Sequence, residues 1–334
     1  MKKIPLMTGD TRYAFASGRI RFLETKLITR AVAVKLLESQ LDDFPRILAE
    51  YEYHLPSGLK TEDDIDRAFN FELEYLLKLV EFLSVDKKFP ILIRKRYDFL
   101  NLAYLMKSKL SNVEFTPTIM GTINPSTIRR IFDNEEWDKL PPELQDGLVL
   151  AKKAYEETEF LSSIDSKLEW QYFAILKNSL PRLEFLKGYY ELYFDMLNIM
   201  NIARCRAFGR TFKNFVQIYL DGGSFDLPFF RNIFELPQEQ IISKLFETEF
   251  GRALGESFQS AIQHYNFTPL QNLIDKIILE YLEQTRYCPF GLELIFSYYK
   301  RKEREIGVIR TIAKAKLYNI PVETIRGSLP YGYS

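Results

Sequence analysis

The stretch Asp98-Phe-Leu-Asn-Leu-Ala-Tyr-Leu-Met-Lys-Ser-Lys109 aligns without a gap on Asp195-Met-Leu-Asn-Ile-Met-Asn-Ile-Ala-Arg-Cys-Arg206. A third stretch, Glu305-Ile-Gly-Val-Ile-Arg-Thr-Ile-Ala-Lys-Ala-Lys316, fits the same frame. In each stretch an acidic residue comes nine and eleven positions before two basic residues, and the apolar residues recur at helical spacing. A pattern that returns at intervals of about 100 residues indicates a repeated helical module.

The apolar and small positions of the three stretches coincide as well. Two apolar positions and one small position are shared: Leu102, Ile199 and Ile309; Leu105, Ile202 and Ile312; Ser108, Cys205 and Ala315. Cys205 therefore occupies a packing position, because a catalytic thiol is not expected to match an alanine. A fainter copy opens the chain, where Asp10 precedes Arg19 and Arg21 by the same offsets.

A second repeated element is the dipeptide Ile-Asp, at Ile65-Asp66, Ile164-Asp165 and Ile274-Asp275. Each dipeptide opens a predicted amphipathic helix, and we expect its aspartate in the first turn, near the positive end of the helix dipole. In the first of these helices, Leu76, Leu77 and Val80 fall on an apolar stripe and Glu72 falls away from it.

The periodicity is helical almost throughout, which predicts an all-α protein. Turn-rich joints separate three similar helical modules, which we place at residues 1–90, 91–187 and 188–334. The third module includes a closing C-terminal helix.

Composition excludes several classes of protein. The 334 residues contain 45 basic and 45 acidic side chains, so no global charge recruits nucleic acid or anionic lipid. Two cysteines, Cys205 and Cys288, are too few for a disulfide framework and favour a reducing cytoplasm. The sequence shows neither a signal peptide nor a transmembrane segment. Its longest uncharged stretch, residues 257–274, contains Gln, Asn, His and Pro.

Catalytic and cofactor motifs find little support. His54 and His264 lie far apart and match no zinc spacing, and no loop carries the Gly-Lys-Ser/Thr ending of a phosphate site. The acidic run at residues 62–66 is followed by Arg67, where an Asp-Asp-x-x-Asp magnesium motif requires an acid. A helix N-terminus rich in acids is the favoured interpretation, and a magnesium-dependent helical enzyme is the alternative. We expect no cofactor and no catalytic residue.

The paired basic residues allow two interpretations. Acids at the start of a helix and cations at its end complement the helix dipole, which explains most of the pattern. The fixed spacing also fits a charged rim or lumen that receives a common partner. The candidate residues are Arg19, Arg21, Lys107, Lys109, Arg204, Arg206, Lys314 and Lys316.

The C-terminal part of the chain resembles a known family. Pro289-Phe-Gly-Leu-Glu293, Lys302-Glu-Arg-Glu-Ile306 with Arg310, and Ile320-Pro321 with Ile325 are similar to the closing segment of the C subunit of archaeal and bacterial V/A-type ATPases, whose vacuolar counterpart is the d subunit. The resemblance extends over the whole chain. Further similar segments are Arg19-Ile-Arg21, Tyr97-Asp-Phe99 and Ala203-Arg-Cys-Arg206.

The resemblance implies a funnel of three helical modules with pseudo-threefold symmetry. It implies a non-catalytic subunit that binds no nucleotide and joins the central stalk (subunits D and F) to the membrane ring of proteolipid subunits. Such a subunit carries torque between the two and is peripheral at the cytoplasmic face of the plasma membrane. The alternative is a soluble helical-repeat scaffold whose repeats stack linearly.

Overall fold

The computed structural model describes residues 9–111, 118–180, 183–248 and 250–333. Every regular element among these residues is a helix, which confirms the predicted all-α class. The chain divides into two compact units. The central unit comprises Ile91–Ile274, and the terminal unit is built from both ends of the chain, up to Pro90 and from Asp275 onward.

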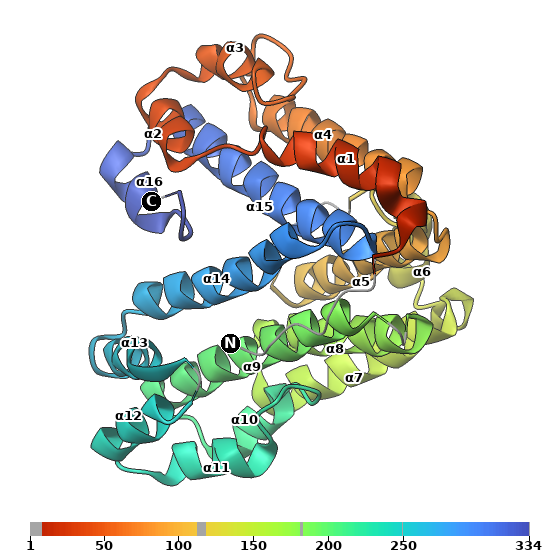
Figure 1. Cartoon of the computed structure of the whole chain (residues 1–334). Coiled ribbons are helices and arrows are strands. Elements are labelled where there is room, and N and C mark those ends of the chain that lie inside the picture. Colours follow the sequence, from red (N-terminus) through yellow and green to blue (C-terminus); the bar gives the residue numbers. More distant parts are fainter. Residues whose placement is uncertain (1–8, 112–117, 181–182, 249, 334) are drawn as a thin grey trace. The chain divides into compact units, whose positions relative to one another are not determined.

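The terminal unit joins the start of the chain to its last long helix. Helix α15 packs along α4 and also contacts α1 and α2 (Figure 1). The elements of this unit are η1 (Thr11–Tyr13), α1 (Ala14–Glu24), α2 (Arg30–Glu38), η2 (Leu41–Asp43), α3 (Phe44–Ala49), α4 (Glu62–Leu83), η4 (Gln284–Tyr287), α15 (Leu292–Leu317) and α16 (Val322–Ser328). The closing helix therefore completes a core that the first residues of the chain begin.

The central unit is a set of helices in which α7 packs along α8, α12 along α13, and α13 against α9 (Figure 1). Its elements are α6 (Pro125–Asp133), η3 (Trp137–Lys139), α7 (Pro142–Thr158), α8 (Leu161–Ser179), α9 (Glu184–Ala207), α10 (Phe212–Ile218), α11 (Leu227–Glu235), α12 (Gln238–Phe246) and α13 (Gly251–His264). The bounds of α5 (Lys88–Ser111) and α14 (Thr268–Glu283) include residues of both units.

The predicted module boundaries can be located on these helices. The boundary between residues 90 and 91 coincides with the division between the two units. The boundary between residues 187 and 188 falls inside α9. The division into three modules therefore stays a prediction.

Local sequence sets where the helices begin. Thr61 and Asp64 form a capping box at the start of α4, in which each side chain accepts a hydrogen bond from the backbone of the other residue. Thr211 and Asn214 form the same arrangement at the start of α10. Asp226 caps α11 by accepting from the Phe229 N–H at 2.9 Å.

The apolar positions shared by the three repeated stretches lie in the cores of their units. Leu102 and Ile199 are fully buried in the central unit, and Ile309 is fully buried in the terminal unit. The apolar stripe predicted on α4 is also confirmed, since Leu76, Leu77 and Val80 are buried.

Glu72 is the exception on α4. It was expected away from the apolar stripe, but it is buried, with 2% of its surface exposed. Its carboxylate accepts a hydrogen bond from the His54 N–H at 2.5 Å and so fixes the loop before α4. Burial raises the pKa of this carboxyl group, while the bond from His54 opposes the rise.

Candidate functional site

The acidic residue of each repeated stretch is buried in the middle of a long helix. Asp98 is the eleventh residue of α5 and Asp195 the twelfth of α9, and their exposed fractions are 2% and 1%. The interpretation of these acids as first-turn complements of the helix dipole is therefore wrong, because each helix begins about three turns earlier.

The two aspartates of the central unit hold the loop that follows their own helix. Asp98 accepts hydrogen bonds from the Thr122 hydroxyl and from the Ile123 N–H at 3.0 Å. Asp195 accepts from the hydroxyl and N–H of Ser224, and from the Phe225 N–H at 3.0 Å. Burial raises the pKa of Asp98, and its hydrogen bonds oppose the rise. We call this contact, in which a buried aspartate of a helix accepts hydrogen bonds from the loop after that helix, a clamp. The same clamp occurs at both aspartates of the central unit.

An asparagine one turn later completes each clamp. Asn101 accepts from the Thr118 N–H at 2.7 Å and donates to the Thr118 carbonyl at 2.9 Å. Asn198 accepts from the Leu220 N–H at 2.9 Å and donates to its carbonyl at 2.8 Å. Each asparagine side chain therefore pairs with both the N–H and the carbonyl group of one loop residue, as the backbone of a neighbouring strand would.

A glycine lets each loop approach its aspartate. A Cβ atom added at Gly121 would lie 2.2 Å from Asp98 Oδ1, and one added at Gly223 would lie 2.2 Å from Asp195 Oδ1. The signal for this clamp was present in the sequence, as Asp-x-x-Asn followed by Gly-Thr or Gly-Ser, but only the acid had been singled out.

The third acid, Glu305, accepts all the hydrogen bonds of a similar cluster in the terminal unit. It is fully buried on α15 and accepts from the Ile28 N–H at 2.7 Å, from the Tyr53 hydroxyl at 2.7 Å and from Lys302 Nζ at 2.6 Å. Burial and the neighbouring Glu305 carboxylate raise the pKa of Tyr53. Here the loop that the acid holds comes from the other end of the chain.

The first cation of two repeated stretches pairs with an Ile-Asp aspartate. Lys107 on α5 contacts Asp165 on α8 at 2.8 Å. Lys314 on α15 contacts Asp66 at 2.8 Å and Glu62 at 2.7 Å, both on α4. These aspartates lie beyond the first turn of their helices, so their role is an ion pair between helices and not the dipole contact that was expected.

Two of the candidate arginines bind the ends of other helices. Arg206 donates to the carbonyl groups of Ile233, Phe234 and Leu236, at the end of α11. Arg21 donates to the carbonyl groups of Thr285 and Cys288 at 2.8 Å, around the end of η4. Each guanidinium complements the negative end of a helix.

The other candidate cations have fewer contacts with described residues. Lys109 is exposed and pairs with Glu135 at 2.7 Å. Arg19 lies 5.4 Å from the centre of the Phe22 ring. The side chains of Arg204 and Lys316 form no ion pair or hydrogen bond with a described residue of their own unit.

A family comparison identifies the kind of protein. The model of the ATP synthase (C/AC39) subunit family matches residues 16–328. The chain belongs to this family. The matched span contains all three buried acids and all eight candidate cations, so the features described above lie inside the C/AC39 region.

Relatives of this C/AC39 chain cover most of its length. It is 23% identical to the C subunit of the A-type ATP synthase of Thermococcus onnurineus, over 91% of this chain and 86% of the relative. It is 24% identical to that of Methanosarcina mazei, over 96% and 93%, and 23% identical to that of Haloferax volcanii, over 96% and 98%. The predicted family is confirmed.

Three of the four acids at residues 62–66 of the C/AC39 chain have side-chain partners in the structure. Glu62 and Asp66 contact Lys314, and Asp64 pairs with Arg67 at 2.7 Å. Hydrogen bonds from Thr61 and Arg67 lower the pKa of Asp64 to about 2. Among the residues that the structure describes, no group of three or more His, Cys, Asp and Glu side chains is placed to hold a metal ion.

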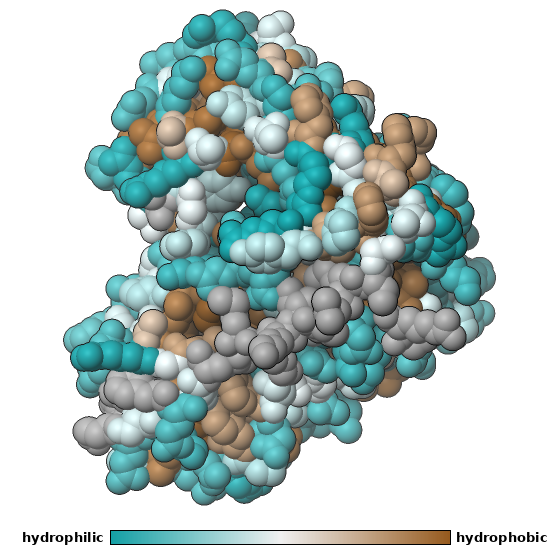
Figure 2. Space-filling view, in the orientation of Figure 1, coloured by the Kyte–Doolittle hydropathy of each residue, from teal (hydrophilic) through white to brown (hydrophobic). Residues whose placement is uncertain are grey.

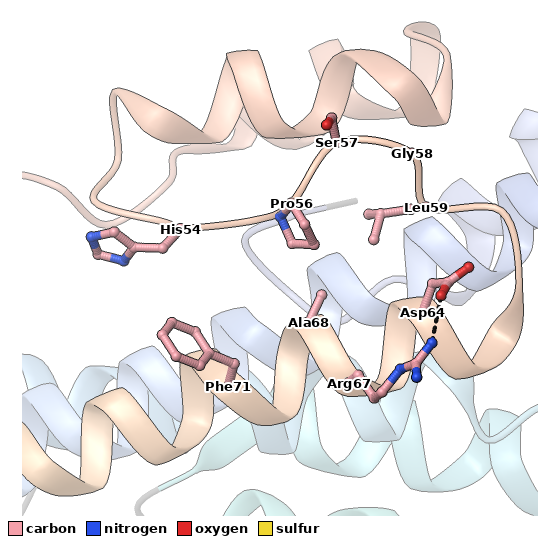
Figure 3. A pocket seen from close by; sticks show the side chains of 9 residues that line it. All are labelled: His54, Pro56, Ser57, Gly58, Leu59, Asp64, Arg67, Ala68 and Phe71. Carbon is pink, nitrogen blue, oxygen red and sulfur yellow. Dashed lines mark hydrogen bonds and ion pairs between the residues drawn. The ribbon is translucent and has the colours of Figure 1, made fainter.

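The surface of the terminal unit has a groove of about 450 Å³ between the loop before α4 and α4 itself (Figure 3). Pro56 and Leu59 face Ala68 and Phe71 across it. Its charged groups, Asp64 and Arg67, pair with each other, as the dashed line in Figure 3 shows. The groove is therefore mainly apolar, and Phe71, which lines it, is 57% exposed.

Exposed aromatic residues gather on α1 and α4 of the same unit. Phe15 and Phe82 are 71% and 70% exposed, and their rings meet edge to face with centres 6.2 Å apart. Figure 2 shows apolar residues at the surface over these two helices. Large exposed apolar groups that contact each other are typical of a protein-binding surface.

None of the described helices is long and apolar enough to cross a membrane.

Proposed function

We propose that this chain is a non-catalytic adaptor in the central rotor of a V/A-type ATPase or ATP synthase. It joins the central stalk, subunits D and F, to the proteolipid ring of the membrane sector, and it transmits torque between them. The match to the C/AC39 family over residues 16–328 carries this proposal, together with relatives named as the C subunit of A-type ATP synthases. The complex would hold the chain as a peripheral subunit at the cytoplasmic face of the plasma membrane.

The buried clamps support a mechanical role. A part that carries torque must resist bending, and buried hydrogen bonds between a helix and its loop restrict such motion. Asp98, Asp195 and Glu305 each tie the middle of a long helix to a distant piece of backbone. We propose that three modules of this kind are arranged about a pseudo-threefold axis as a funnel.

Two surfaces of unlike chemistry support binding to two partners. The aromatic surface of Phe15 and Phe82 offers apolar contact area to one of them. The second contact is the proposed basic rim of Arg19, Arg21, Lys107, Lys109, Arg204, Arg206, Lys314 and Lys316. Most of these cations have partners within the chain, so we propose that Arg19, Arg204 and Lys316 contribute most to partner binding.

Co-purification tests the proposal. The tagged chain, expressed in its own host and solubilised with mild detergent, should bring with it both the stalk subunits and the ring proteolipid. A variant with Phe15→Glu and Phe82→Glu should lose one of the two groups of partners and keep the other. Recovery of neither group with the unmodified chain would overturn the adaptor role.

The scaffold alternative predicts a different shape. A linear stack of repeats gives a solenoid, whereas the adaptor requires closure about an axis. Small-angle X-ray scattering of the isolated chain distinguishes them, because an extended solenoid has a larger radius of gyration than a compact funnel of the same length.

A further inference from the structure

The loop between α3 and α4 in the terminal unit is anchored at both ends. At one end the Tyr53 hydroxyl donates to the buried Glu305 carboxylate at 2.7 Å, and at the other the Thr61 N–H donates to Asp64 at 3.0 Å. Gly58 lies between these anchors at φ 78°, and a Cβ atom added there would meet nothing within 4 Å. The middle of the loop therefore has room to move, and it forms one wall of the groove on α4 (Figure 3).

His54 and Glu72 form the contact between this loop and the middle of α4. The His54 N–H donates to Glu72 Oε1 at 2.5 Å, and His54 Nδ1 lies 3.8 Å from the same oxygen. The His54 side chain is 50% exposed, whereas that of Glu72 is 2% exposed. The His54 ring also lies against that of Tyr75, with ring centres 5.1 Å apart. Protons from solvent can therefore reach an imidazole that is held beside a buried carboxylate.

Protonation of either side chain favours the closed loop. Burial raises the pKa of Glu72, while the backbone hydrogen bond and the charge of His54 oppose the rise. Opening of the loop would return the carboxyl group to water, so its contribution to closure is complete at low pH and is lost as the pH rises through the raised pKa. An imidazole that becomes charged beside a carboxylate acts in the same direction. Closure is therefore coupled to the uptake of protons.

The other charged and titratable groups around this pair come from three helices and the loop. On the groove side, Asp64 and Arg67 of α4 pair with each other. On the other side, Lys302 lowers the pKa of Glu72, but less than His54 does. A small cavity there of about 20 Å³ is also lined by Arg19 of α1, Glu52 of the loop, and Tyr298 and Lys302 of α15. Side chains of these types ordinarily keep their charge between pH 6 and 8, whereas an imidazole does not.

We propose that residues 53–60 form a pH-sensitive flap on α4, which closes as His54 and Glu72 take up protons and loosens as they lose them. An exposed imidazole 3.8 Å from a buried carboxylate that also binds the loop backbone carries this proposal. Loosening of the flap uncovers Leu59, which lines the groove and is 3% exposed in the closed loop. The flap lies within the terminal unit and does not depend on the adaptor role.

Hydrogen exchange of the full chain tests the flap. The protection factor of the His54 N–H is its intrinsic exchange rate divided by the observed rate. It should rise about two- to fivefold from pH 8 to pH 6, as expected for a partly exposed ion pair. The Leu220 N–H is the internal control, because it donates to the neutral side chain of Asn198 at 2.9 Å. Its protection factor should stay constant over the same range.

Two variants of the pair separate the flap from other sources of pH dependence. His54→Gln keeps the backbone donor but cannot gain a charge, so the rise from pH 8 to pH 6 should shrink by at least half. Glu72→Gln keeps an acceptor for the loop without the charge, so the flap should stay closed and the rise should be nearly absent. The matched control is His264→Gln, which replaces an exposed histidine of the central unit and should leave the rise unchanged.

The outcomes decide the proposal without touching the adaptor role, which co-purification tests. Equal protection of the His54 N–H at pH 6 and pH 8 in the unmodified chain would overturn the flap. An undiminished rise in His54→Gln would also overturn it, because another group would then control the loop. This variant decides the question even if Glu72→Gln fails to fold, since the His54 side chain is half exposed and its removal leaves the core intact.

Discussion

Asp195 accepts two hydrogen bonds from Ser224, one from its backbone N–H at 2.9 Å and one from its hydroxyl group. This pair joins the middle of α9 to the loop that leads into α11. Asp98 and Thr122 form the corresponding hydroxyl–carboxylate contact on α5. Both repeated stretches of the central unit therefore share a buried carboxylate that holds the loop after its helix in place.

Replacing Asp195 tests what this contact contributes. Asp195→Asn keeps the shape of the side chain but leaves at least one donor of the loop facing an amide, and unpaired buried donors cost about 1–3 kcal/mol. The free energy of unfolding, measured with urea and circular dichroism, should fall by about that amount. The control is Asp146→Asn on α7, where the aspartate is exposed. Equal stability of the two variants would contradict the clamp.

Gly223 should not tolerate a side chain. In Gly223→Ala the new methyl group would meet a carboxylate that three hydrogen bonds hold in place, so the loop must move. Overpacking of this kind costs about 1–3 kcal/mol of folding free energy. Gly307→Ala in α15 meets no atom within 4 Å, and removing a helical glycine there should raise stability by about 1 kcal/mol. Thermal unfolding midpoints should therefore move in opposite directions.

The ion pair between Lys107 and Asp165 should show coupling between α5 and α8. Lys107 is 15% exposed and Asp165 is 45% exposed, so solvent weakens the attraction. A double-mutant cycle with Lys107→Ala and Asp165→Ala should give a coupling energy of about 0.5–1 kcal/mol. The same cycle on Lys139 and Asp165, which no ion pair joins, should give zero within error. A zero value for Lys107 and Asp165 as well would show that the pair does not connect the helices.

Both cysteine thiols should be unreactive at mildly alkaline pH. Burial raises the pKa of Cys205 to about 11 and that of Cys288 to about 11. At pH 8 only about one thiol in a thousand is then ionised, against about a quarter for an ordinary cysteine. Labelling with a thiol reagent at pH 8 should be roughly a hundredfold slower in the folded chain than in urea.

The same shift makes stability depend on alkaline pH. The folded-state pKa of each thiol lies above that of the unfolded chain, so the stability it contributes is complete below about pH 8.5 and is lost as the pH rises toward about 11. Replacing both residues by serine should remove this part of the pH dependence. Rapid labelling of the folded chain at pH 8 would show that the thiols are not buried.

The sequence was sufficient to predict the helical class and the apolar positions shared by the three repeated stretches, because periodicity and spacing reflect burial directly. The family followed from the resemblance of particular segments to known members. It did not place the acids correctly. Asp98 and Asp195 lie in helix interiors because the residues before them also form helix. The start of α5 has a local signal, since the Lys88 N–H donates to Asp86 Oδ1 at 2.9 Å, but α9 begins without a side-chain cap.

The partners of the cations also required the structure. Arg206 binds carbonyl groups some thirty residues further along the chain, and Lys314 binds α4 from the other end of the chain. Such contacts depend on how helices pack, which spacing within one helix does not determine.

The most direct measurement of the adaptor role is proton or sodium pumping coupled to ATP hydrolysis in a reconstituted complex with and without this chain. With the chain, ATP hydrolysis should drive ion transport into vesicles. Without it, the stalk-bearing head should detach from the ring, and hydrolysis should continue without transport. Undiminished ion transport by a complex that lacks the chain would contradict the account.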